Sequence, residues 1–151
     1  NIAGLSTAAV VVPDENLRHK VWRGLNTDEC GEPNAFAVQA AVSAYTGCAP
    51  WLDELLEYVW KNRRYAEEFI QHEIPKLKAV ASDATYLMWV DVSATGMSGN
   101  EFAEKLRKET GLYINAGNHY GAGGENFVRI NLATSKALVQ DALARLKLFV
   151  N

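Results

Sequence analysis

The stretch ENFVRINLAT, Glu125 to Thr134, has the alternating pattern of a half-buried β-strand. One face of that strand carries three branched apolar side chains: Val128, Ile130 and Leu132. The other face mixes aromatic, charged, amide and methyl groups: Phe127, Arg129, Asn131 and Ala133. The arginine has two interpretations. In the first, Arg129 lies on an edge or surface strand and points into water, where most long charged side chains are found. In the second, Arg129 faces a cleft and binds an anion. The pattern favours the first and leaves the second open.

The sequence around this strand predicts a small α+β sandwich. A strand is predicted over Ala84 to Val92, and a helix follows that opens with the capping box Ser98 to Glu101. After Gly111 a short strand is predicted over Leu112 to Asn115. The chain then passes through a glycine-rich loop, the opening strand and a final amphipathic helix. From about residue 79 onward we therefore expect a mixed sheet covered by helices, and the fold class as a whole is α/β.

The sequence predicts mostly helices in the first half of the chain. The apolar run Ala8 to Val12 suits a strand buried on both faces, and Pro13 with Asp14 ends it and opens a helix. Asn34 is a candidate N-cap for the next helix, which is apolar on nearly every side. A long helix is predicted from Pro50 to about Glu73. The strand of this region has no obvious partners, so the first third cannot close a sheet by itself.

Composition excludes several classes of protein. With 151 residues and 48% hydrophobic content, the chain is globular and able to bury a core. A net charge of -3 argues against nucleic-acid binding, so we interpret Lys61, Arg63 and Arg64 as a solvated helix face. Cys30 and Cys48 form no CxxC pair, which argues against a zinc site and fits a reducing compartment.

No apolar run approaches the roughly 20 residues that span a bilayer, and the N-terminus lacks the layout of a signal peptide. We therefore expect a cytoplasmic protein without a membrane partner. The first residue is Asn1 and not Met, which suggests a piece of a longer protein.

The remaining candidate sites are weak when taken alone. The loop Gly117 to Gly124 matches neither GxGxxG nor the P-loop and leads into a strand, so its glycines are better explained by a sharp turn and close approach to a ligand or partner. His119 and Tyr120 lie in that loop as ordinary loop residues or as exposed functional groups. The other two histidines are distant, and no hydrolase triad is supported. The tryptophans are expected in the core or at an interface: Trp22, Trp51, Trp60 and Trp89.

Three stretches together resemble the C-terminal half of fold-type I pyridoxal-phosphate enzymes. These are NIAGLSTAAVVVPDENLR, WLDELLEYVWKNRRYAEEFI and GAGGENFVRINLAT. They are most similar to the cystathionine β-lyase (carbon-sulfur lyase) branch of the class I/II aminotransferases, and the resemblance covers essentially the whole chain. It implies that residues 1–49 are the tail of the large cofactor-binding domain, 50–74 an interdomain helix and 75–151 the C-terminal small domain. It also implies a homodimer.

The resemblance assigns roles to few residues here. The Schiff-base lysine of that family would lie upstream of Asn1, so no catalytic residue is expected in this chain, which alone would be inactive. The residue that matches the family's substrate-carboxylate arginine is Arg129, and Tyr120 is assigned as a second substrate-binding residue. Tyr120 stands where the family often has Phe, and Asn126 where it often has Gly, which leaves substrate choice open. Residues that bind the cofactor are not identified, and no metal site is expected.

The resemblance does not distinguish a lyase from an aminotransferase, since both bind an amino-acid substrate. An alternative from another class is a non-catalytic α+β module that binds a small acid or a protein partner. That alternative expects the chain to be complete and Arg129 to lie on an open face.

Overall fold

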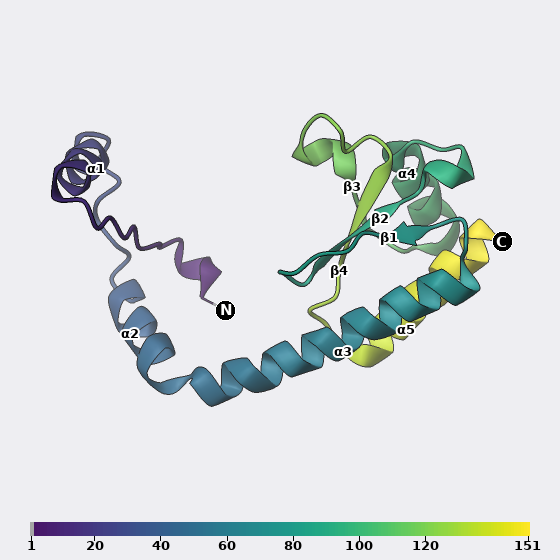
Figure 1. The fold of residues 1–151 in the computed structure, drawn as a ribbon, viewed down its shortest axis with the longest axis horizontal. Coiled ribbons are helices and arrows are strands. Elements are labelled where there is room, and N and C mark those ends of the chain that lie inside the picture. The colour runs from purple at the N-terminus through teal and green to yellow at the C-terminus, as the bar shows by residue number, and fades with distance from the viewer. Residues whose placement is uncertain (1) are drawn as a thin grey trace. The chain divides into compact units, whose positions relative to one another are not determined.

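The computed structural model describes residues 2–151 and divides into two compact units, Asn1–Asp53 and Glu54–Asn151 (Figure 1). The 25-residue helix α3, Ala49–Glu73, begins in the first unit and continues in the second. The long helix predicted from Pro50 is thus confirmed, because its apolar residues recur at helical spacing and Pro75 prevents its continuation.

The first unit contains the 3-10 turn η1 (Ala3–Leu5) and the helices α1 (Glu15–Thr27) and α2 (Ala37–Gly47). Helix α1 begins where Pro13 and Asp14 predict it, and the Asp14 carboxylate accepts a hydrogen bond from the Leu17 amide at 2.7 Å. Helix α2 begins later than predicted. The Asn34 side chain accepts from the Phe36 amide and so closes a turn before the helix, while Phe36 is the N-cap residue.

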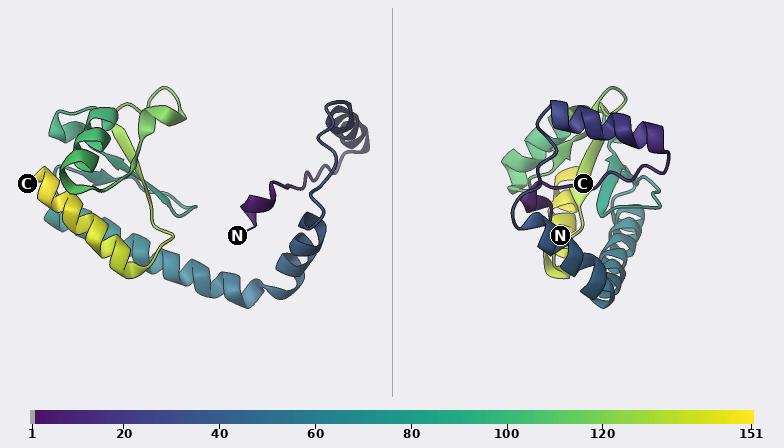
Figure 2. Two further views of the ribbon diagram at one scale, coloured as in Figure 1. Left: turned by 180° about the vertical axis from the view of Figure 1, so that it is seen from behind. Right: turned by 90° about the vertical axis from the view of Figure 1, so that its left-hand side faces the viewer.

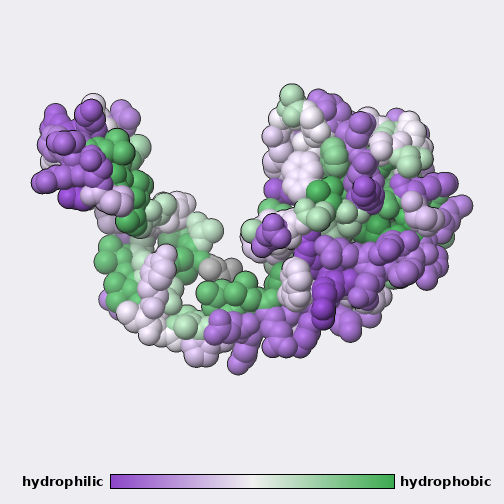
Figure 3. Space-filling model, viewed as in Figure 1, coloured by the Kyte–Doolittle hydropathy of each residue, from purple (hydrophilic) through white to green (hydrophobic). Residues whose placement is uncertain are grey.

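The predicted buried strand over residues 8–12 is wrong. This segment forms neither helix nor strand and is exposed, with Val11 at 87%. The physical reason is that a strand needs a neighbour for its backbone groups, and the described residues provide none. Apolar side chains of this unit lie on its surface instead (Figure 3).

The tryptophans do not all lie in the core, and for the exposed ones the expectation of an interface stays a prediction. Trp22, Trp51 and Trp60 are each about half exposed, and only Trp89 is largely covered by its surroundings. Helix α2, which is apolar on nearly every side, likewise buries Ala37 but exposes its larger side chains. Apolar periodicity identified the helices correctly without showing what covers them.

The second unit is built on a four-stranded sheet in the order β1-β2-β4-β3. Its strands are β1 (Lys78–Ala79), β2 (Leu87–Asp91), β3 (Asn115–Ala116) and β4 (Phe127–Asn131). All three pairings are antiparallel, so the sheet is not the mixed sheet that we predicted. Within it, β4 is paired on both sides, with Trp89 on β2 and Asn115 on β3 both opposite Arg129.

Short helices complete this unit: η2 (Ser93–Thr95), α4 (Gly99–Thr110), η3 (Gly117–Tyr120) and α5 (Lys136–Val150). The Ser98 half of the predicted capping box of α4 is confirmed, since the Ser98 hydroxyl accepts from the Glu101 amide, while the Glu101 carboxylate pairs with Lys105. Gly111 ends the helix with a φ of 75°, as predicted. Helices α3 and α5 lie side by side (Figures 1 and 2), and an ion pair joins Lys147 to Glu73.

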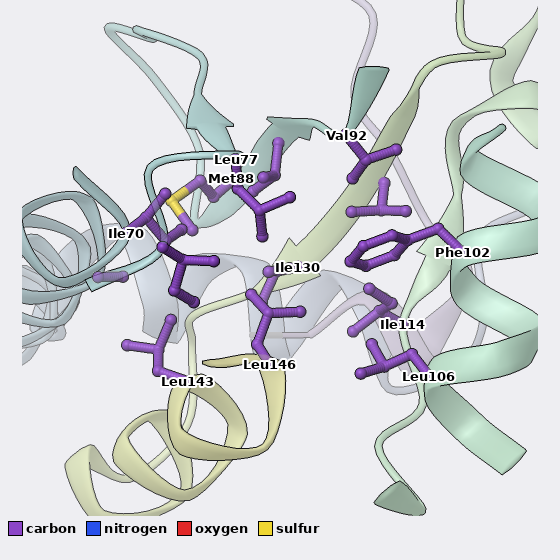
Figure 4. Close-up of a cluster of buried hydrophobic side chains, with 14 of the residues drawn as sticks. Ile70, Leu77, Met88, Val92, Phe102, Leu106, Ile114, Ile130, Leu143 and Leu146 are labelled. Carbon is purple, nitrogen blue, oxygen red and sulfur yellow. The ribbon is translucent and has the colours of Figure 1, made fainter. Parts of the chain in front are cut away.

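The hydrophobic core lies between one face of the sheet and helices α3, α4 and α5 (Figure 4). Val128, Ile130 and Leu132 are buried there, which confirms the predicted apolar face of the ENFVRINLAT strand. Met88 and Val90 of β2 join them, and Phe102 fills the space between α4 and the sheet. The opposite face of the sheet therefore carries Trp89, Phe127 and Arg129.

Two polar residues of α3 are buried against this core. Asn62 is 2% exposed and donates to the carbonyls of Leu132 and Thr134 at 3.0 and 2.9 Å. Arg63 is 3% exposed, so the interpretation of Arg63 as part of a solvated face is wrong. Its Nε donates to Glu67 at 2.8 Å and its Nη2 to the Val80 carbonyl at 3.1 Å, which offsets the cost of burying the charge. Both residues tie the long helix to the ends of strands.

We predict that Asn62→Ala lowers the free energy of unfolding by about 2 to 3 kcal/mol, because it leaves two carbonyls without their donor. Urea denaturation of the 151-residue chain measures this effect. The matched control is Asn100→Ala, since Asn100 lies on helix α4 and its amide donates only to Glu104 in an exposed pair. Equal effects of the two substitutions would show that the Asn62 bonds contribute nothing specific.

Candidate functional site

The candidate site lies on the sheet face that the core helices do not cover, centred on Arg129. The half-buried Arg129 side chain extends from the middle of β4, between its register partners Trp89 and Asn115. The Cζ atom of Arg129 lies 4.1 Å from the centroid of the Tyr120 ring. An aromatic ring at this distance attracts a guanidinium and holds it against one ring face. The structure thus brings together the two residues that the sequence singled out.

Within residues 2–151, Arg129 has no charged partner. Its Nε is buried and has no hydrogen-bond acceptor within residues 2–151, and none of the ion pairs formed by these residues includes Arg129. A guanidinium presents five donors in one plane, and a buried donor without an acceptor costs about 1 to 3 kcal/mol. A half-buried cation without a carboxylate is therefore suited to bind an anion.

The carboxylate of Asp91, on the same sheet face, is hydrogen-bonded to another residue. Asp91 occupies the end of β2, opposite Phe127, and accepts a hydrogen bond from the Ser93 amide at 2.8 Å. Hydrogen bonds from Ser93 lower the pKa of the Asp91 carboxyl below its ordinary value. Asp91 therefore stabilises the turn η2 and leaves the charge of Arg129 uncompensated.

The glycine loop places Tyr120 over Arg129. The loop folds so tightly that a Cβ added at Gly117 would lie 2.4 Å from the Gly124 carbonyl oxygen and 2.9 Å from Cζ3 of Trp89. Gly121 and Gly123 have φ values of 117° and 93°, which other residues rarely adopt. The predicted sharp turn is confirmed, and the close backbone contacts that the structure shows lie within the loop itself. The approach of the loop to a ligand or partner stays a prediction.

Trp89 is a residue of this site that sequence reasoning missed. Its ring centroid lies 5.6 Å from that of Tyr120 and 6.0 Å from that of Phe127, both at edge-to-face angles. The signal was present in the stretch LMWVD, where alternation places Trp89 on the face opposite Met88 and Val90. The apolar neighbours of Trp89 instead favour a place in the core or at an interface.

The other candidate residues lie apart from Arg129. His119 is exposed in η3, and Asn126 is exposed with its carbonyl accepting from the Val92 amide at 2.9 Å. Cys30 and Cys48 are free and exposed. No group of three potential metal-binding side chains occurs within residues 2–151. Over the same residues, no helix has the length and apolar character needed to cross a membrane.

Comparison with known proteins identifies the family of the chain. Residues 7–146 match the family model described as aminotransferase class I and II. The chain belongs to this family. It is 44% identical over 147 residues to cystathionine beta-lyase PatB of Bacillus subtilis, covering 97% of this chain and 38% of that protein.

Solved structures of the family show the same fold. Cystalysin of Treponema denticola, whose structure contains a pyridoxal 5'-phosphate cofactor, is 27% identical with a TM-score of 0.91. The PLP-bound C-S lyase of Staphylococcus hominis is 28% identical with a TM-score of 0.85. These comparisons cover 99% of this chain and 38% and 39% of those chains. The chain therefore spans less than two fifths of the length of these relatives.

We predict that Gly117→Ala lowers the free energy of unfolding by about 1 to 3 kcal/mol, because the new methyl group overlaps the Gly124 carbonyl and the Trp89 ring. Chemical denaturation measures the change. Gly24→Ala is the control, since Gly24 lies within α1 and an added Cβ meets no atom within 4 Å. That control should be neutral or slightly stabilising, as alanine favours helix. An unchanged stability of Gly117→Ala would contradict the close packing of the loop.

Proposed function

We propose that this chain is the C-terminal part of a pyridoxal-phosphate-dependent carbon-sulfur lyase that acts on amino acids, with Arg129 binding the substrate α-carboxylate. The observation that carries the proposal is the half-buried guanidinium of Arg129, which has no carboxylate partner within residues 2–151 and is covered on one side by Tyr120. The relatives named above include enzymes called cystathionine beta-lyase and C-S lyase, which supports a lyase over an aminotransferase.

The chemistry of a guanidinium fits a carboxylate closely. Two parallel N–H donors match the two oxygens of a carboxylate, and each such charge-assisted bond contributes roughly 1.5 to 3 kcal/mol. The Tyr120 ring lies on one side of the guanidinium, 4.1 Å from Cζ to the ring centroid, and the carboxylate binds N–H groups that this ring leaves free. Because β4 is paired on both sides, the backbone that carries Arg129 is fixed before the substrate binds.

The residues of this chain fit the substrate end of such an active site better than the cofactor end. The glycine loop enters a strand, and its interior is filled by contact between Gly117 and Gly124, so it provides no cradle for a phosphate. We assign the cofactor lysine and the other cofactor contacts to the part of the relatives that this chain does not cover. When bound, pyridoxal phosphate supplies an electron sink, while Arg129 orients the substrate so that its Cα–H bond is presented for proton removal.

The same proposal gives the chain its place in the complete enzyme. Residues 1–49 belong to the large cofactor-binding domain, residues 50–74 form the connecting helix, and residues 75–151 form the small domain. A cytoplasmic homodimer completes the proposal. The exposed apolar side chains of the first unit support the assignment of this chain to a larger protein, since such surfaces are normally covered by other parts of a protein.

A second candidate is a non-catalytic module that binds a small organic acid. It is favoured by one observation: Arg129, Tyr120, Trp89 and Phe127 all lie within the unit of residues 54–151. Such a module would bind acids without regard to an amino group at Cα. Turnover of amino acids by the complete protein distinguishes the two functions.

For the complete enzyme we predict that Arg129→Ala lowers kcat/KM for an amino-acid substrate by ~10² to 10³, or about 3 to 4 kcal/mol, because two charge-assisted bonds are lost. Arg129→Lys should recover only part of this loss, since an ammonium group cannot make the forked contact. The measurement is kcat/KM for the amino acid and for its amide in each variant.

The matched control is Arg107→Ala. Arg107 also lies over a tyrosine, with its Cζ 5.0 Å from the ring centroid of Tyr113, but it belongs to helix α4 and not to the candidate site. We expect the control to leave kcat/KM unchanged. If Arg129→Ala reduces activity toward the acid and the amide equally, Arg129 does not bind the carboxylate.

A further inference from the structure

A shallow recess adjoins Arg129 on the open face of the sheet. It has a volume of about 320 Å³ and is lined by Val80, Trp89, Tyr120, Phe127, Gly117 and residues 121–124. All of these residues belong to the second unit. Its walls are thus aromatic and aliphatic, and its remaining boundary is the glycine loop.

Two residues that line the recess, Tyr120 and Trp89, are also neighbours of Arg129. Tyr120 covers the guanidinium of Arg129 at 4.1 Å, and Trp89 is the register partner of Arg129 on β2. Phe127 precedes Arg129 by two residues on β4 and therefore lies on the same face. A small molecule that places a carboxylate on Arg129 thus has this recess within reach of the rest of its structure.

The lining indicates which chemical group the recess accepts. None of the lining residues carries a charged side chain, and the carboxylate of Asp91 on this face is bound to Ser93. A charged substituent would lose its hydration there without gaining a partner. An apolar or thioether group would contact the ring of Trp89, and contacts between sulfur and aromatic rings contribute about 0.3 to 1.5 kcal/mol.

We propose that this recess binds the side chain of the amino-acid substrate and selects substrates whose sulfur carries an apolar substituent. Trp89 is the residue that determines this specificity. The inference rests on the proposed function and extends it, since Arg129 binds what all amino acids share, whereas the recess distinguishes one side chain from another. The tight packing of Gly117 and Gly124 keeps the loop compact and the recess open.

The test compares two substrates of the complete enzyme, S-benzyl-cysteine and S-methyl-cysteine, in the wild type and in Trp89→Ala. We expect the wild type to prefer the benzyl compound in kcat/KM, and Trp89→Ala to reduce that preference by about 10-fold or more, because one wall of the recess is removed. Trp89→Phe should retain part of the preference. Tyr113→Ala is the control, since Tyr113 is an exposed aromatic residue that does not line the recess, and it should leave the preference unchanged.

The rates of the wild type and the Trp89 variants distinguish failure of this inference from failure of the proposed function. If Trp89→Ala lowers kcat/KM equally for both substrates, or for neither, the recess does not bind the side chain, although lyase activity in the wild type would still support the proposed function. If the wild type cleaves neither substrate, the proposed function fails and this inference fails with it. If the ratio changes only in Trp89→Ala and, to a smaller extent, in Trp89→Phe, the recess determines specificity.

Discussion

The pairing of β4 on both sides is the constraint on which the rest of the second unit depends. Pairing with β2 and β3 fixes the direction of every side chain along the strand. Val128 and Ile130 must then enter the core, and Arg129 must leave it. A shift of the register by one residue would expose the two apolar side chains and bury a charge. The free-energy cost of this change would exceed the stabilisation from any polar contact on the open face. The position of the arginine is therefore a consequence of core packing.

The loop before β4 adds the aromatic surroundings of this arginine. Its glycines permit backbone contacts that any side chain would block, and the resulting compact turn brings Tyr120 over the guanidinium. The contacts of Asn62 with Leu132 and Thr134 act at the other end of the strand and fix the helix α3 against it. Core, loop and helix thus converge on one strand, and a side chain fixed from three directions is suited to recognise a ligand without rearrangement.

Local patterns predicted the helices, the start of a helix at Pro13 and Asp14, the cap at Ser98, and the alternation of the ENFVRINLAT strand, because these features depend on neighbouring residues alone. Predictions that depend on contacts between residues far apart in the sequence were less accurate. Residues 8–12 have a strand composition but no neighbour to pair with, and Arg63 is buried because Val80 and Glu67 accept its hydrogen bonds. The role of Trp89 was missed for the same reason. Trp89 lies opposite Arg129 because of the register between β2 and β4, and the two residues are 40 positions apart in the sequence. The direction of pairing could not be read from the strands themselves.

The role of Arg129 is tested most directly by a crystal structure of the complete enzyme with a bound amino acid that cannot react further. We predict that both oxygens of the α-carboxylate lie within about 3 Å of guanidinium nitrogens of Arg129, with the Tyr120 ring still packed against the guanidinium. A carboxylate bound by other residues, with Arg129 turned to solvent or paired with a side chain from another part of the enzyme, would contradict it.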